Sequence, residues 1–239
     1  MINVNGKEVR VHETMINSPN ILVLIQGSCM PYNQVCNIAV KDAIIDAGIA
    51  SVIMYDSSRD WDALETADTN PEWRAAFDGK TFQDELREAR ALFYYVNDEY
   101  SPDKLFLSGR SYGGSLGALI AGDRIENLER VMLTSPQLFF SQDEELPNIY
   151  QNAPAHEEIL ESIAHYSMKL RIVSGLGETE EFIVGARELF RHAGIEARPP
   201  RDKEWTILDT DHTSSDDPTA KPLTYHAYVK QHLDFFGQK

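Results

Sequence analysis

The most informative part of the sequence is the stretch 105–122, which reads LFLSGRSYGGSLGALIAG. Its apolar start predicts a buried strand, and the small residues after Gly113 predict a tightly packed helix. Between them, the pattern Gly-x-Ser-x-Gly places Ser111 at a sharp turn with Gly109 and Gly113 on either side, where a Cβ would collide with the neighbouring strand or helix. The stretch therefore predicts a strand, a turn and a helix, with one serine hydroxyl projecting from the turn.

The same alternation of short apolar runs and helical periodicity extends over the rest of the chain, as is typical of a parallel sheet covered on both faces. Strands are expected at 21–25, 51–55, 105–108, 131–133, 170–173 and 205–208, and helices at 34–47, 81–98, 113–122, 155–166, 180–193 and 222–235. The pair Asn5-Gly6 predicts a turn between two antiparallel strands at the start of the chain. We therefore expect residues 1–239 to form one doubly wound α/β domain, with ligands beyond the carboxyl ends of the strands.

Two connections, 56–80 and 135–152, are longer than is usual between strands and helices. Both follow the carboxyl end of a predicted strand. Trp61 and Trp73 in the first connection and Phe139 in the second are candidate walls of a substrate pocket, because large aromatic side chains in a loop need something to bury against. The alternative is that both connections are surface loops without a binding role.

Composition narrows the choice of partners. The chain has 22 Lys and Arg against 38 Asp and Glu, a formal net charge of −16, which would repel the phosphates of nucleic acids and anionic lipid surfaces. Its apolar runs, such as 21–25, are too short to span a membrane. The two cysteines, Cys29 and Cys36, do not make a disulfide framework, and the first residues do not resemble a signal peptide. We expect a cytoplasmic protein that binds neither nucleic acid nor membranes, with an oligomeric state that the sequence leaves open.

A serine hydroxyl becomes nucleophilic when a base takes its proton, so a partner histidine is expected. Among seven histidines, His212 is the one that follows the last predicted strand in a loop, at the same sheet edge as Ser111. An acid is needed to orient that histidine, and Glu178 follows the strand 170–173 at the same edge. Asp143, in the loop after the preceding strand, is the competing acid. The acidic residues next to Glu178 are interpreted as complementing the dipole of the following helix.

These residues together resemble the α/β-hydrolase family over nearly the whole chain. The resemblance rests on the turn around Ser111, the loop Gly175-Leu-Gly-Glu178 and the loop Asp211-His212, in the order Ser, Glu, His. The turn also resembles those of small carboxylesterases and of prolyl-oligopeptidase-like catalytic domains, although a propeller domain is missing. The resemblance implies a mostly parallel sheet of about eight strands with an antiparallel N-terminal hairpin, helices on both faces and a small cap or none.

The resemblance also implies an oxyanion hole made of backbone N–H groups. We assign these to Tyr112 and Ser28, with Cys29 as the alternative second donor. The chain departs from the family in having Gln26-Gly27 where His-Gly is common, and Glu where Asp is the commonest acid.

The expected reaction is hydrolysis of a small acyl ester through an acyl-enzyme, without a metal or an organic cofactor. The same three residues would also serve a peptidase, a thioesterase or a carbon–carbon bond hydrolase. A binding protein that holds a small molecule without turnover is the alternative from a different class.

Overall fold

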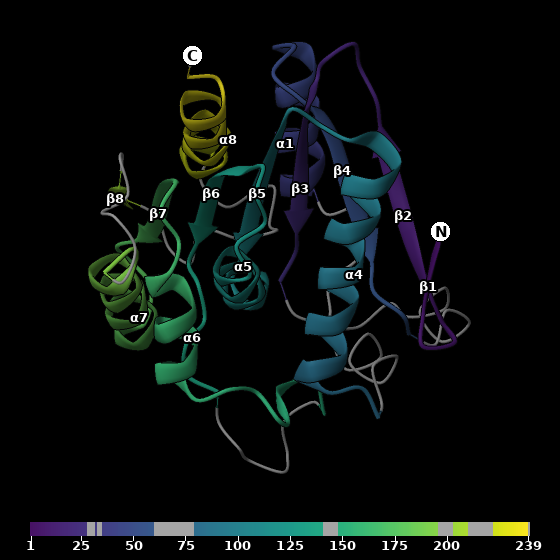
Figure 1. Cartoon of the computed structure of the whole chain (residues 1–239). Coiled ribbons are helices and arrows are strands. Elements are labelled where there is room, and N and C mark those ends of the chain that lie inside the picture. The colour runs from purple at the N-terminus through teal and green to yellow at the C-terminus, as the bar shows by residue number, and fades with distance from the viewer. Residues whose placement is uncertain are drawn as a thin grey trace.

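The computed structural model describes residues 1–27, 32, 35–59, 79–140, 148–195, 203–209 and 222–238. Its centre is an eight-stranded sheet in the order β1-β2-β4-β3-β5-β6-β7-β8 (Figure 1). The strands are β1 (Ile2–Val4), β2 (Lys7–Thr14), β3 (Asn20–Ile25), β4 (Ser51–Asp56), β5 (Lys104–Arg110), β6 (Leu128–Thr134), β7 (Lys169–Gly175) and β8 (Lys203–Leu208). The strands from β4 to β8 across the sheet pair in parallel, whereas β1 with β2 and β2 with β4 pair antiparallel.

The antiparallel start of the sheet follows from its turn. Asn5 and Gly6 have φ angles of 52° and 82°, the positive values that a type I′ hairpin turn requires. The side chain of Asn3 accepts a hydrogen bond from the N–H of Gly6 at 2.9 Å. The predicted N-terminal hairpin is therefore confirmed.

Helices cover both faces of the sheet. They are α1 (Val35–Asp46), α4 (Phe82–Tyr100), α5 (Tyr112–Gly122), α6 (His156–Ala164), α7 (Glu180–His192) and α8 (Pro222–Phe236), with a 3₁₀ turn at Asn148–Tyr150. Alternate residues of β3 point to opposite faces: Ile21, Val23 and Ile25 join the core formed with α4, α5, α6 and α7, and Leu22 and Leu24 join the core formed with α1 and α8. The prediction of a parallel sheet covered on both faces is thus confirmed.

Local sequence signals explain where the helices begin. Thr81 caps α4, because its side chain accepts the N–H of Asp84 and the carboxylate of Asp84 accepts the N–H of Thr81. Helix α5 begins directly after the turn at Ser111, and its residues from Tyr112 to Ala121 are all buried. Within the described ranges, no helix combines the length and apolar character needed to cross a bilayer.

The parallel register aligns the strand ends that matter for the site. Gly109 of β5 lies opposite Ile25 of β3, and Arg110 lies opposite Thr134 of β6, which in turn lies opposite Val173 of β7. The loops that follow these strands therefore begin side by side at one edge of the sheet.

Candidate active site

The turn at Ser111 has the backbone conformation that the motif predicts. Ser111 has φ 52° and ψ −120°, a region that residues other than glycine rarely adopt and that costs about 1–3 kcal/mol. Three hydrogen bonds hold it there: its N–H donates to Thr134 O at 2.8 Å, and its carbonyl accepts from Gly114 N at 2.8 Å and Gln137 N at 3.1 Å. Ser111 is half-buried, whereas the ten residues that follow are buried. The turn therefore leaves this serine accessible at the start of a buried helix.

Two glycines make this sharp turn possible. A Cβ on Gly109 would lie 2.3 Å from the carbonyl oxygen of Gly113, and a Cβ on Gly113 would lie 2.3 Å from the carbonyl oxygen of Gln26. Both contacts are with backbone atoms, which cannot move aside without disturbing the sheet. The steric reason for Gly-x-Ser-x-Gly given by the sequence is thus present in the structure.

The first backbone N–H of α5 belongs to Tyr112, which directly follows Ser111. The first N–H groups of a helix have no acceptor within the helix, and they lie at the positive end of its dipole. The ring of Tyr112 is buried and its hydroxyl donates to Ile149 O at 3.1 Å, which fixes the residue. Ser28 and Cys29, the candidates for the second oxyanion donor, lie outside the described residues.

Glu178 lies in the short loop between β7 and α7. Its side chain is only 8% exposed, and its Oε1 accepts a hydrogen bond from the hydroxyl of Ser135. Glu180 and Glu181, in the first turn of α7, are exposed, as expected for residues that complement a helix dipole. Burial therefore separates Glu178 from its acidic neighbours. Asp143, the competing acid, lies outside the described residues.

His212 also lies outside the described residues, so the structure gives no position for the expected base. The other six histidines are described. His12 of β2 contacts Asp56 at 3.0 Å, His156 contacts Glu157 at 3.0 Å, and His226 of α8 is exposed. His165 and His192 are half-buried, each at or near the end of a helix, and His232 is fully buried in α8.

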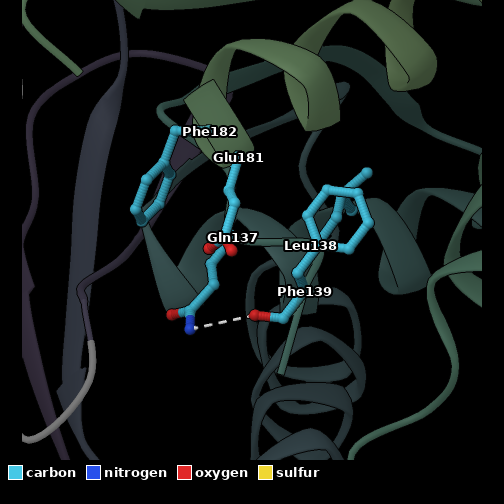
Figure 2. Close-up of a pocket in the computed structure, with 5 residues that line it drawn as sticks. All are labelled: Gln137, Leu138, Phe139, Glu181 and Phe182. Atoms are coloured by element: carbon cyan, nitrogen blue, oxygen red, sulfur yellow. Dashed lines mark hydrogen bonds between the residues drawn. The ribbon is translucent and has the colours of Figure 1, made fainter. Parts of the chain in front are cut away.

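A small cavity opens between the segment after β6 and the first turn of α7. Its volume is about 30 Å³, and its lining residues are Gln137, Leu138, Phe139, Glu181 and Phe182. Figure 2 shows these side chains together, with the amide of Gln137 donating to the carbonyl of Phe139 at 3.5 Å. The cavity adjoins the turn, because the N–H of Gln137 donates to Ser111 O.

Phe139 also lines a second, larger pocket of about 340 Å³, together with Leu138, Phe140, Ala153, Pro154, Ala155 and His156. The rings of Phe139 and His156 lie 5.2 Å apart. Of the three aromatic residues proposed from the sequence, Phe139 therefore lies at two cavities, whereas Trp61 and Trp73 lie outside the described residues.

Two features of the site region were missed by the sequence analysis. One is the contact of Ser135 with Glu178; its signal was the position of Ser135 directly after β6, at the same edge as the site. The other is a buried pair in the core, in which Ser108 Oγ lies 2.9 Å from His232 Nε2. No local pattern signals that pair, since its two residues are 124 positions apart.

No protein-family model matches the chain, and no curated protein sequence matches it. Solved structures do match, at low sequence identity. Est1E from Butyrivibrio proteoclasticus, solved with ferulic acid bound, has a TM-score of 0.69 at 14% identity, with 99% of each chain covered. A dienelactone hydrolase from Anabaena variabilis has a TM-score of 0.69 at 13% identity, covering 98% of this chain and 94% of that one.

A monoacylglycerol lipase from Paleococcus ferrophilus has a TM-score of 0.63 at 14% identity, covering 95% of this chain and 99% of that one. Identities this low carry the fold and not the substrate. The agreement extends over nearly the full length of all three structures. The chain therefore has the α/β-hydrolase fold.

Proposed function

We propose that this protein is a serine hydrolase that cleaves small acyl esters, with Ser111 as the nucleophile, His212 as the base and Glu178 as the acid. The observation that carries the proposal is the positive φ of Ser111 in a turn closed by Gly109 and Gly113. A strained serine is retained where the surrounding structure enforces it, and such residues cluster at active sites.

The reaction proceeds in two halves. Ser111 Oγ attacks the acyl carbon while His212 accepts its proton, and the resulting oxyanion is stabilised by the N–H of Tyr112 and a second N–H, from Ser28 or Cys29. The intermediate collapses when His212 gives the proton to the leaving alcohol. Water then attacks the acyl-enzyme, again losing a proton to His212, and the carboxylic acid is released with Ser111 restored.

In these reaction steps, Glu178 is the acid that orients His212. Its burial at the carboxyl edge and its hydrogen bond from Ser135 suit a carboxylate that holds one geometry. A base must be neutral to accept a proton, so kcat/KM should fall as the pH drops through about 6–7, the ordinary range for histidine.

Esters are favoured over peptides because an alkoxide or phenoxide leaves more readily than an amine. Est1E was solved with ferulic acid bound, and a carboxylic acid is the kind of product that ester hydrolysis releases. The small cavity lined by Gln137, whose N–H donates to Ser111 O, supports a short acyl group. Thioester and peptide substrates remain the alternatives that the same three residues could serve.

Labelling with a fluorophosphonate tests the proposal, since the reagent reacts with an activated serine. The expected result is a single modified peptide containing Ser111, loss of labelling in Ser111→Ala, and loss of p-nitrophenyl acetate hydrolysis in the same variant. Label on Cys29 or on another serine would contradict the assignment. A folded protein that takes up no label would instead be the non-catalytic binding protein.

A further inference from the structure

The residue that directly follows β6, Ser135, occupies an unusual backbone position. Its φ is 47°, although it is neither glycine nor asparagine, and it precedes Pro136, which disfavours helical backbone angles in the residue before it. Its N–H donates to Val173 O at 2.8 Å, and the residue is fully buried. The backbone of Ser135 thus continues the pairing of β6 with β7 by one hydrogen bond. This bond does not involve the side chain of Ser135.

The side chain of Ser135 has a separate role. Its hydroxyl contacts Oε1 of Glu178, which comes from the loop after the neighbouring strand. An ionised carboxylate has no proton to give, so the hydroxyl is the donor in this pair. A hydrogen bond to a charged acceptor is stronger than a neutral one, and both partners here are shielded from water, Ser135 fully and Glu178 to all but 8%. The contact therefore fixes one carboxylate oxygen of Glu178 from the neighbouring strand.

We propose that Ser135 is a positioning residue for catalysis, whose hydroxyl fixes the orientation of the Glu178 carboxylate. The inference rests on the proposed function, in which Glu178 is the acid. Because Ser135 holds Oε1, the carboxylate of Glu178 has one preferred rotation about its last side-chain bond. Both oxygens belong to one planar group, so this rotation also fixes the position of Oε2. Orientation of the histidine by the acid matters because a misplaced base loses much of its catalytic effect.

Two substitutions separate the hydroxyl from the backbone. Ser135→Gly and Ser135→Ala both remove the hydrogen bond to Glu178. Glycine adopts a φ of 47° without strain, whereas alanine keeps the strain that serine already has at this position. An effect of the hydroxyl should appear equally in both variants, and an effect of relieving the backbone strain only in Ser135→Gly.

The expected result for Ser135→Gly is a kcat about tenfold lower on p-nitrophenyl acetate, with KM within about twofold of the original value, as for the loss of one charge-assisted hydrogen bond that orients a catalytic group. Ser135→Ala should show a similar loss of kcat, because it removes the same hydrogen bond and leaves the backbone strain unchanged. In a Glu178→Ala background, Ser135→Gly should change kcat less than about twofold, because the group through which it acts is gone.

Three outcomes would overturn the inference. One is a Ser135→Gly variant with unchanged kcat while Glu178→Ala is strongly impaired; then the hydroxyl alone is irrelevant and the proposed function stands. Another is an equal loss from Ser135→Gly with and without Glu178, which would mean that Ser135 acts by another route. If Glu178→Ala retains full kcat while Ser111→Ala loses it, the assignment of the acid fails and the inference falls with it.

Discussion

Ser108 Oγ and His232 Nε2 lie 2.9 Å apart between β5 and α8, three residues before the turn at Ser111. His232 Nδ1 lies 3.0 Å from the carbonyl oxygen of Tyr228. A carbonyl only accepts, so Nδ1 carries the proton and Nε2 accepts from the Ser108 hydroxyl. The atoms match a serine–histidine pair, but Ser108 is 3% exposed and His232 is 0% exposed, so no substrate reaches them. We interpret this contact as a hydrogen bond of the core.

Burial of His232 predicts a specific loss of stability in acid. Desolvation, opposed by the hydrogen bond to Tyr228 and assisted by the charge of Arg171, lowers the pKa of His232 from 6.5 to about 4. In this pH range the unfolded chain binds a proton that the folded chain does not, so the free energy of unfolding falls as the pH drops from 6.5 toward 4. The contribution is complete above pH 6.5 and amounts to about 3 kcal/mol over the whole range.

Urea unfolding of the original protein and of His232→Gln between pH 7 and 4 measures this contribution. The variant should be less stable at pH 7 and lose less stability on acidification. His226→Gln is the matched control, because His226 lies on the same helix and is exposed. If all three proteins lose stability in parallel, His232 is not the group responsible.

Ser108→Ala and Ser111→Ala should have opposite effects on activity and stability. Removing the Ser108 hydroxyl leaves Nε2 of a fully buried histidine without its donor, which should cost about 1–3 kcal/mol of unfolding free energy. Fluorophosphonate labelling should continue at about the original rate in Ser108→Ala and be abolished in Ser111→Ala. Loss of labelling in a folded Ser108→Ala variant would make the buried pair part of the catalytic machinery.

Glu178→Gln should reduce kcat by about 10³–10⁴-fold, the loss expected when the orienting acid of a triad becomes an amide. Glu180→Gln is the control. It removes the same charge from a residue that is exposed and lies two positions after Glu178. Stopped assays of p-nitrophenyl acetate hydrolysis on both purified variants, with circular dichroism to verify folding, make the comparison. Equal activities of the two variants would move the acid to another residue, with Asp143 the first candidate.

A buried ionic cluster at the start of α4 should matter for stability. Lys80 Nζ lies 2.6 Å from Glu85 Oε1, 2.7 Å from Glu88 Oε2 and 2.8 Å from the carbonyl oxygen of Ser58, and the three charged residues are 2–6% exposed. Removing the cation leaves two carboxylates in a buried position, so Lys80→Met should cost about 3–5 kcal/mol.

Lys104→Met is the control for this loss, because the ion pair of Lys104 with Glu129 spans 2.9 Å at a position where the lysine side chain is 44% exposed. Such pairs contribute at most about 1 kcal/mol. The midpoint of urea unfolding compares the two variants with the original protein. Equal midpoints for both lysine variants would show that the buried cluster relaxes or takes up protons instead of destabilising the fold.

The fold could be predicted from local patterns because each element carries its own signal. The apolar run of β3 and the Asn5-Gly6 turn each act over a few residues, and both were found in the structure as expected. The capping pair Thr81 and Asp84 acts over an equally short range. The turn at Ser111 could be predicted in the same way, because its pattern of glycines is local. A Cβ on Gly109 would collide with Gly113, and a Cβ on Gly113 would collide with Gln26.

The rest of the site depends on contacts between distant segments, which no local pattern encodes. Ser135 and Glu178 are 43 positions apart and meet only because β6 and β7 are neighbours in register. The same holds for the cavity, which joins Phe139 after β6 to Phe182 at the start of α7. The sequence could place Phe139 in a loop at the correct edge, but it could not predict that Gln137 and Phe182 share its cavity.

The size of the small cavity should limit the length of the acyl chain that the enzyme accepts. The cavity lined by Gln137, Phe139 and Phe182 measures about 30 Å³, which leaves little apolar wall for a long acyl chain. Each added methylene contributes its ~0.8 kcal/mol, about fourfold in kcat/KM, only where apolar wall is available to bury it. We therefore expect kcat/KM for p-nitrophenyl esters to be highest at two to four acyl carbons, roughly the length at which such a wall is exhausted.

The variant Phe182→Ala tests whether this cavity receives the acyl chain, since it removes one ring from the lining. It should raise kcat/KM for hexanoyl relative to acetyl esters, whereas Glu180→Ala, an exposed change in the same helical turn, should leave the ratio unchanged. A steady increase in kcat/KM up to decanoyl esters in the original protein would contradict the prediction. So would an unchanged ratio in Phe182→Ala, because the chain would then lie along another surface, such as the larger pocket between Phe140 and His156.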